Sequence, residues 1–228
     1  MPISDRTAAL RFGDDGAQRY CGAVTRDLDA LHCLFSGLPK DHAGIRISGM
    51  EALRPFLETD GSIGLIAADA LGAASRSVRA ILFDKTAETN WSLAWHQDRT
   101  ICVRKRIDSN GFGQWTIKAG MQHVAPPFDL LTRMITLRVH LDDVPATNAP
   151  LLIAPGSHKS GQISVNEVEE VVRRCGTEVC IAEAGDVWLY ATPILHASEA
   201  ATTPTHRRVL QIDFAAENLP NGLEWLGV

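Results

Sequence analysis

The sequence predicts a mainly β protein with helices packed on its outside, and two observations carry this fold class. In the first third of the chain, apolar residues recur at the three- and four-residue spacings of a helix. From about residue 76 the pattern changes to short apolar runs separated by turn residues. We therefore expect one domain over 1–228, with a helical part at about 1–75 and a β-core at about 76–216.

Two helices are expected in the N-terminal part. The first covers residues 23–38 and places its apolar residues on one face, namely Val24, Leu28, Leu31, Leu34 and Phe35. The second covers the apolar residues 63–71, and Gly72 is suited to end it. Together they predict a helical layer over one side of the β-core.

The β-core is predicted from seven short runs and one further helix at 165–174. The runs cover residues 78–84, 100–106, 134–142, 151–154, 178–181, 186–190 and 208–214. So many short strands with turns between them are typical of a sandwich or a barrel. The order of the strands cannot be predicted from this pattern.

Composition excludes several classes of function. The 228 residues carry a net charge of -5, whereas a nucleic-acid-binding protein needs a concentrated basic face. The only basic cluster, residues 104–106, is short enough to be a solvated strand end. No window approaches the roughly 20 apolar residues of a membrane span, and no signal peptide is evident. We expect a cytoplasmic protein with reduced cysteines and a small-molecule substrate, and the oligomeric state stays open.

A metal site is predicted from the spacing of His96 and Asp98. Two residues apart on an extended segment, they point to the same side. His140 and Asp142 have the same spacing, so the motif alone does not choose between the pairs. His196 follows the predicted strand 186–190 and supplies a third ligand. About five strands separate it from the His96 pair, enough to wrap a barrel around an ion, so we favour His96, Asp98 and His196.

Two histidines and one carboxylate leave coordination positions open and are diagnostic of non-haem Fe(II) oxygenases, with zinc as the chemical competitor. The residues after His196 support an oxygenase. Ser198 lies two residues on, and Arg207 begins the apolar strand 208–214. A buried arginine needs an anionic partner, and its planar fork suits a carboxylate. Near iron, the two would bind the distal carboxylate of a dicarboxylic cosubstrate. A surface salt bridge is the alternative for Arg207, and Arg208 is the neighbouring candidate.

These motifs, taken in order, resemble the phytanoyl-CoA dioxygenase family over about residues 80 to 216. The matching segments are residues 95–98, 141–143, 154–159 and 184–187, followed by His196, Ser198 and Arg207. The resemblance implies a double-stranded β-helix, that is, a jelly-roll or cupin-like barrel, with helices outside. It also implies Fe(II), 2-oxoglutarate and O2, with Ser198 and Arg207 holding the 2-oxoglutarate tail and Asp98 counting against halogenation.

The sequence departs from the family in two places. Residues 148–150 replace the usual Asn-Gly pair, and Arg138 stands where an aromatic residue is common. Because Arg138 is on the polar face of strand 134–142, we expect it to line the site and bind an anion. A salt bridge on the outer surface is the alternative. His140 and His158 are further candidates for substrate binding, and Lys85 for cosubstrate binding.

The function expected from these residues is hydroxylation of a C–H bond in a small carboxylate-bearing molecule, with release of succinate and CO2. The alternatives are a zinc-dependent hydrolase of cupin type and a catalytically silent jelly-roll binding protein.

Overall fold

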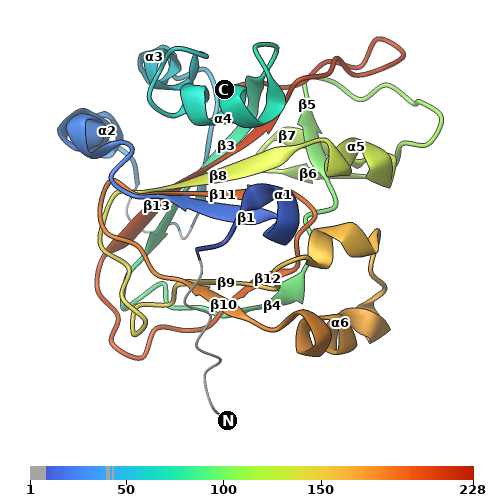
Figure 1. Ribbon diagram of the computed structural model, residues 1–228. Helices are drawn as coiled ribbons and strands as arrows, with labels where there is room; N and C mark the ends of the chain where they lie inside the picture. The colour runs from blue at the N-terminus through green and yellow to red at the C-terminus, as the bar shows by residue number, and fades with distance from the viewer. Residues whose placement is uncertain (1–8, 40–41, 43) are drawn as a thin grey trace.

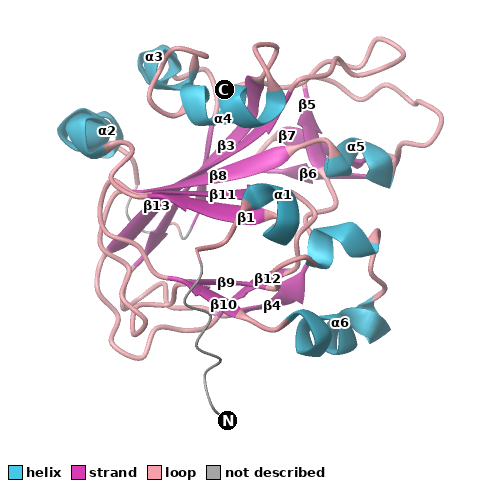
Figure 2. Cartoon of the chain, viewed as in Figure 1, coloured by secondary structure: helices cyan, strands magenta, loops and turns pink. Residues whose placement is uncertain are grey.

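The computed structural model describes residues 9–39, 42 and 44–228, and its centre is two antiparallel sheets that lie one above the other (Figure 1). The larger sheet has six strands in the order β1-β11-β8-β13-β3-β2, and the smaller has four in the order β10-β9-β12-β4. Helices lie outside both sheets, as Figure 2 shows. This is a mainly β, jelly-roll arrangement, so the fold class predicted from the sequence is confirmed.

The larger sheet contains the longest strands. Its strands are β1 (Ala17–Tyr20), β2 (Gly44–Ile47), β3 (Arg76–Lys85), β8 (Ile135–His140), β11 (Val187–Ala191) and β13 (Arg207–Ala215). β13 lies between β3 and β8 and pairs antiparallel with both. Residues on its outer face, such as Leu210 and Ile212, are fully buried under helices, whereas the alternate residues point between the two sheets. The strands predicted at 78–84, 134–142, 186–190 and 208–214 correspond to four of these.

The outer face of the larger sheet is covered by α2 (Leu28–Phe35), α3 (Arg54–Leu57) and α4 (Gly64–Leu71). Leu31 of α2 and Ile66 of α4 belong to the same buried cluster as Leu137 of β8. Burial of each such side chain stabilises the fold by about 1.5–3 kcal/mol. The N-terminal helical layer is therefore held mainly by hydrophobic contact with the sheet.

The first third of the chain differs from the prediction in two respects. The helix expected over 23–38 is present as the 3-10 turn Thr25–Asp27 followed by α2 (Leu28–Phe35). The backbone N–H of Val24 donates to the Gly185 carbonyl, and an added Cβ on Gly185 would lie 2.4 Å from the Thr25 hydroxyl. β1 and β2 were also not predicted. Each has four residues at an edge of the sheet, too few to show a clear alternation of apolar and polar residues.

The smaller sheet was predicted only in part. It consists of β4 (Leu93–His96), β9 (Leu151–Ile153), β10 (Glu178–Cys180) and β12 (His196–Ser198). β9 and β10 match the predicted runs at 151–154 and 178–181, while β4 and β12 carry site residues and were not predicted as strands. The helix expected at 165–174 is present as the 3-10 turn Val165–Glu167 followed by α6 (Val168–Cys175), which packs against β4.

A third sheet extends one end of the barrel. It has the order β5-β7-β6, with β5 (Ile101–Val103), β6 (Gly113–Lys118) and β7 (Met121–Ala125), and α5 (Phe128–Thr132) follows it. The strand predicted over 100–106 ends at Val103, so the basic residues 104–106 lie beyond it and are exposed. Among the described residues, no helix is long and apolar enough to cross a membrane.

Candidate active site

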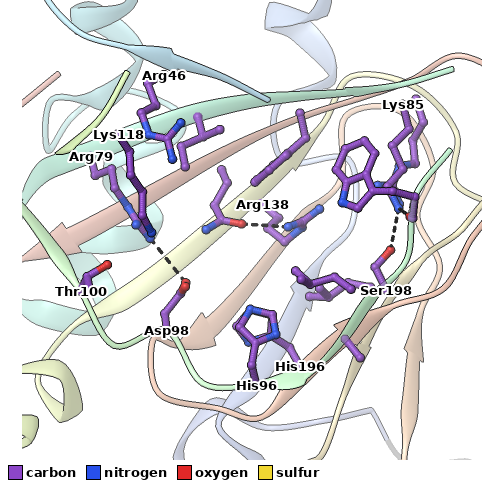
Figure 3. A pocket seen from close by; sticks show the side chains of 18 residues that line it. Arg46, Arg79, Lys85, His96, Asp98, Thr100, Lys118, Arg138, His196 and Ser198 are labelled. Atoms are coloured by element: carbon purple, nitrogen blue, oxygen red, sulfur yellow. Dashed lines mark hydrogen bonds and ion pairs between the residues drawn. The ribbon is translucent and has the colours of Figure 1, made fainter. Parts of the chain in front are cut away.

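His96, Asp98 and His196 converge at one end of the space between the sheets. β12 pairs with β4 so that His196 lies directly opposite His96, and their ring centroids are 4.2 Å apart. Asp98 follows β4 by two residues, and one potential ligand atom from each of the three side chains lies within 4.8 Å of the others. Figure 3 shows the three side chains facing the same cavity. The geometry suits one divalent ion bound on one face.

Backbone carbonyls fix the orientation of both rings. The His96 Nδ1 lies 2.8 Å from the Ala94 carbonyl, and the His196 Nδ1 lies 3.0 Å from the Ile194 carbonyl. If each Nδ1–H donates to its carbonyl, each Nε2 has a free lone pair for a metal. Burial lowers the pKa of His196 to about 4, so its ring is neutral at physiological pH, as metal binding requires.

Asp98 is held by a buried ion-pair network. The Arg79 guanidinium lies 3.4 Å from Asp98 and donates at 2.6 Å to Asp213, which in turn accepts from Thr136. Burial alone would raise the pKa of Asp98, but the charge of Arg79 outweighs it and holds that pKa below its usual value. Asp98 is therefore ionised and fixed in place. Arg79 and Asp213 were not recognised from the sequence, although charged residues inside apolar strands were a visible signal.

His140 and Asp142, the second pair with the same spacing, do not form a metal site. His140 belongs to β8, its side chain is buried, and neither ring nitrogen has a hydrogen-bond partner among the described residues. Burial and the nearby Arg138 lower the pKa of His140 well below its usual value. The ring lies near the cationic residues but does not line the cavity, contrary to its expected role in substrate binding.

The cavity beside the three convergent residues has a volume of about 200 Å3. Asp98 is the only carboxylate among the described residues that line it, whereas six lining residues are cationic: Arg46, Arg79, Lys85, Lys118, Arg138 and Arg207. Leu93, Ile81, Phe83 and Trp91 supply apolar wall. A cavity with this charge distribution is suited to small anionic molecules.

Arg207 begins β13 and is 3% exposed, with its side chain lining the cavity. It donates to the Ala149 carbonyl, but its Nε has no acceptor among the described residues. Burial and the charge of Arg138 lower the pKa of Arg207 to about 9. A buried guanidinium without a carboxylate partner is costly, so an anionic ligand would relieve this cost.

Ser198 and Lys85 complete this end of the cavity. Lys85 is the register partner of Arg207 across β3 and β13, and its Nζ donates to Ser198 Oγ at 3.0 Å. The same Nζ lies 4.5 Å from the centroid of the Trp91 ring. Burial, then Arg207 and Arg138, lower the pKa of Lys85 to about 7. Arg208, the neighbouring candidate, points away and pairs with Asp142 at 2.6 Å, so it is not part of the cavity.

Arg138 lies in the middle of the cavity wall. It is 7% exposed, donates to Gln211 at 2.8 Å and lies 5.5 Å from the centroid of Phe83. Its Nε has no acceptor among the described residues. The structure thus places Arg138 on the inner face, so it does not form the outer-surface salt bridge that was the alternative. Asp142, one of the partners of that alternative, is paired with Arg208.

His158 lies elsewhere. It belongs to the 3-10 turn Ser157–Ser160, and its ring packs so tightly on Gly16 that an added Cβ there would approach within 2.2 Å. It does not line the cavity, so its expected role in substrate binding has no support in the geometry. Residues 148–150, which replace the family's usual Asn-Gly pair, lie just before β9. Ala149 there adopts a positive φ of 50°, a conformation that glycine takes more easily.

A jelly-roll barrel with two histidines and a carboxylate at one end of its cavity is the architecture of the cupin-like non-haem oxygenases. The chain belongs to the phytanoyl-CoA dioxygenase (PhyH) family, whose profile matches residues 55–209. The family resemblance recognised in the sequence motifs is therefore confirmed. Fold and family together support an oxygenase of the iron- and 2-oxoglutarate-dependent type.

Solved structures with the same fold share little sequence with this chain. HygX from Streptomyces hygroscopicus, crystallised with nickel and 2-oxoglutarate, has a TM-score of 0.61 at 15% identity, over 91% of this chain and 87% of its own. EctD from S. alaskensis, crystallised with 2-oxoglutarate and 5-hydroxyectoine, has a TM-score of 0.66 at 18% identity, over 100% and 83%.

A third similar structure is that of an epimerase. SnoN from nogalamycin biosynthesis is described as a non-heme alpha ketoglutarate dependent epimerase and has a TM-score of 0.60 at 16% identity, over 90% of this chain and 78% of its own. No curated protein sequence matches the chain. At these identities the similarity establishes the fold, and the substrate has to be inferred from the cavity.

Proposed function

We propose that this protein is an Fe(II)- and 2-oxoglutarate-dependent dioxygenase that hydroxylates a C–H bond of a small anionic molecule and releases succinate and CO2. One observation carries the proposal: His96, Asp98 and His196 share a cavity with Arg207, a buried cation that has no carboxylate partner in the described part of the chain. The first three provide a facial metal site, and the fourth provides a site for a carboxylate.

His96, Asp98 and His196 are the proposed iron ligands. Both imidazole Nε2 atoms and the Asp98 carboxylate face one point, and the set leaves positions open for a chelating cosubstrate and for O2. Bound iron would supply the oxidising chemistry, while the chain contributes a fixed ligand geometry and a cavity lined mostly by cationic and apolar side chains. Arg79 would keep the carboxylate of Asp98 from turning away from the ion.

Arg207, Ser198 and Lys85 are the proposed site for the 5-carboxylate of 2-oxoglutarate. Arg207 and Lys85 are register partners on adjacent strands, and Lys85 already donates to Ser198. A carboxylate between them would accept charge-assisted hydrogen bonds from the guanidinium and the ammonium group. HygX and EctD, which share the fold, were both crystallised with 2-oxoglutarate.

Arg138 is the proposed contact for a carboxylate near the metal, either that of the substrate or the 1-carboxylate of the cosubstrate. Its Nε is buried and finds no acceptor in the part of the chain that the structure describes, and Gln211 accepts a hydrogen bond from Nη1 of the same guanidinium. Replacing Arg138 by Leu is expected to remove substrate-driven turnover while leaving 2-oxoglutarate binding largely intact. Substrate-driven turnover that survives in the variant would exclude Arg138 from substrate recognition.

The deciding experiment is oxygen uptake by the purified protein with Fe(II), 2-oxoglutarate and a panel of amino acids, their derivatives and other small carboxylates. A substrate should stimulate succinate release and gain the mass of one oxygen atom. Zinc-dependent hydrolysis without oxygen uptake would support the hydrolase alternative. Neither activity, together with no 2-oxoglutarate binding, would support a silent binding protein. An oxidised product without added oxygen would replace hydroxylation by another oxidative reaction at the same site.

A further inference from the structure

Two cationic side chains line the cavity at the end away from Ser198 and Lys85. Figure 3 shows Arg46 and Lys118 beside Arg79, above Asp98, whereas Lys85 and Ser198 lie on the opposite side. His96 and His196 lie between these two groups. The cavity therefore has two cationic ends with the candidate metal centre between them.

Arg46 and Lys118 have no ion-pair partner among the described residues. Asp98 and Asp213 are both already paired with Arg79. The Nε of Arg46 is buried and has no hydrogen-bond acceptor within residues 9–39, 42 and 44–228. After burial, the charges of Arg79, Arg46 and Lys118 further lower the pKa of the buried His123. A positive field without a counter-charge at this end favours an anion.

The cosubstrate does not account for this end of the cavity. A 2-oxoglutarate molecule with its tail at Arg207 and Ser198 would reach the metal ligands with its other end and stop there. The space on the Asp98 side then belongs to the substrate. Its walls include Thr100 and Ile81, and its two unpaired cations are Arg46 and Lys118.

Both cations are carried by elements at the edge of the barrel. Arg46 is on the edge strand β2, opposite Ile81 of β3, and so shares the inward face of the sheet. Lys118 is the last residue of β6, directly before the turn at Ala119 and Gly120, where both residues have positive φ, 50° and 77°. This tight turn places Lys118 at the tip of a hairpin. Arg46 also lies outside the segment 55–209 that the family profile matches.

We propose that Arg46 and Lys118 form the binding site for an anionic group of the substrate, a carboxylate or a phosphate, at the end remote from the C–H bond that is attacked. The inference rests on the proposed function, because it takes the other end of the cavity to be filled by 2-oxoglutarate. This site would select substrates by the negative charge at their far end rather than by the size of an apolar group.

The test uses inorganic phosphate and acetate as probes of the full-length protein, saturated with 2-oxoglutarate and with Mn(II) in place of iron. Calorimetry measures each dissociation constant, and Mn(II)-induced 31P relaxation reports whether bound phosphate lies in the same cavity as the metal. At least one probe is expected to bind with a dissociation constant below about 10 mM. Arg46→Gln and Lys118→Gln should each weaken that binding about 10-fold, the usual value of a charge-assisted contact.

Matched controls separate a site from a general loss of charge. Lys105→Gln removes an equally exposed lysine outside the cavity and should leave probe binding unchanged. Arg46→Lys should restore most of the affinity, since it keeps the charge on β2. The affinity for 2-oxoglutarate should stay within about twofold of the unmodified protein in Arg46→Gln and Lys118→Gln.

The failures of the two proposals can be told apart. If 2-oxoglutarate does not bind at all, the proposed function fails. If 2-oxoglutarate binds normally but neither probe binds, or binding is the same in both variants, the anion site is overturned while the oxygenase stands. A best substrate that is uncharged at the far end would also overturn it.

Discussion

The two sheets that form the walls of the cavity present different kinds of side chain to it. The smaller sheet presents His96 and His196 on strands of four and three residues, and Asp98 in the loop that follows. The larger sheet presents Arg79, Lys85, Arg138 and Arg207 on long, deeply buried strands. The smaller sheet thus offers electron-pair donors to a metal, and the larger sheet offers the charged hydrogen-bond donors to anions, with Ser198 of the smaller sheet as a neutral addition. A bound cation and bound anions need electrostatic fields of opposite sign. Because the metal ligands and the cationic residues lie on separate sheets, each group is held rigidly in its own field.

Removing a donor from the smaller sheet should have the largest effect. His96→Ala and His196→Ala are each expected to reduce Fe(II)- and 2-oxoglutarate-dependent oxygen uptake to background, because two ligands do not hold the ion in place. Metal content after dialysis and circular dichroism would show loss of iron from a folded protein. His206→Ala, at an exposed histidine that does not line the cavity, is the control and should keep full activity. Undiminished iron binding in His196→Ala would contradict the assignment of the metal ligands to the smaller sheet.

Breaking the network that joins the two walls should cost stability. Arg79→Met leaves Asp213 buried without its partner and is expected to lower the free energy of unfolding by about 3–5 kcal/mol. Arg79→Met combined with Asp213→Leu should recover a large part of that loss, because the uncompensated charge is gone. Urea denaturation of Arg79→Met, Asp213→Leu and the double variant measures the coupling between the two residues. Strictly additive losses would show that the pair does not act as a unit.

A cation of the larger sheet should affect the cosubstrate alone. Arg207→Gln is expected to raise the dissociation constant of 2-oxoglutarate by about 10- to 100-fold, equivalent to about 1.5–3 kcal/mol for a charged hydrogen bond. Arg208→Gln, one residue along and paired with Asp142 outside the cavity, is the matched control and should change it less than twofold. The reverse result would move the carboxylate site to the other face of β13.

The smallest expected effect is a pH dependence at Lys85. With a pKa of about 7 in the free protein, Lys85 is mostly neutral above that pH. A bound carboxylate favours the charged form, so binding takes up a proton, and affinity for 2-oxoglutarate should fall as the pH rises from about 7 to 9. The same lowered pKa makes folding stability rise with pH over this range, because the unfolded chain holds the proton more tightly. Calorimetry in buffers of different ionisation enthalpy detects the uptake, which Lys85→Arg should abolish.

The sequence predicted the larger sheet better than the smaller one. Long buried strands such as β3 and β13 have enough alternating residues to be recognised, whereas β4 and β12 have four and three residues. The convergence of His96, Asp98 and His196 was predicted nonetheless, because the spacing of His96 and Asp98 is local and the number of strands before His196 favoured this pair over His140 and Asp142. Arg46 and Lys118 could not be predicted as a pair, since only the fold brings β2 beside the hairpin tip. His158 was misplaced for the same reason: its neighbour, Gly16, is distant in sequence.

The cationic residues of the cavity affect the stability of the native state and its resistance to proteolysis. Burial and then the charge of Arg138 lower the pKa of Arg207, and burial followed by the charges of Arg207 and Arg138 lowers the pKa of Lys85. These like charges repel one another while no anion lies between them. Every anion that binds there favours the native state over the unfolded chain, by about 2.7 kcal/mol at a concentration one hundred times its dissociation constant. Resistance to proteolysis should then follow the supply of the cosubstrate, so that the chain is best protected when it has material to turn over.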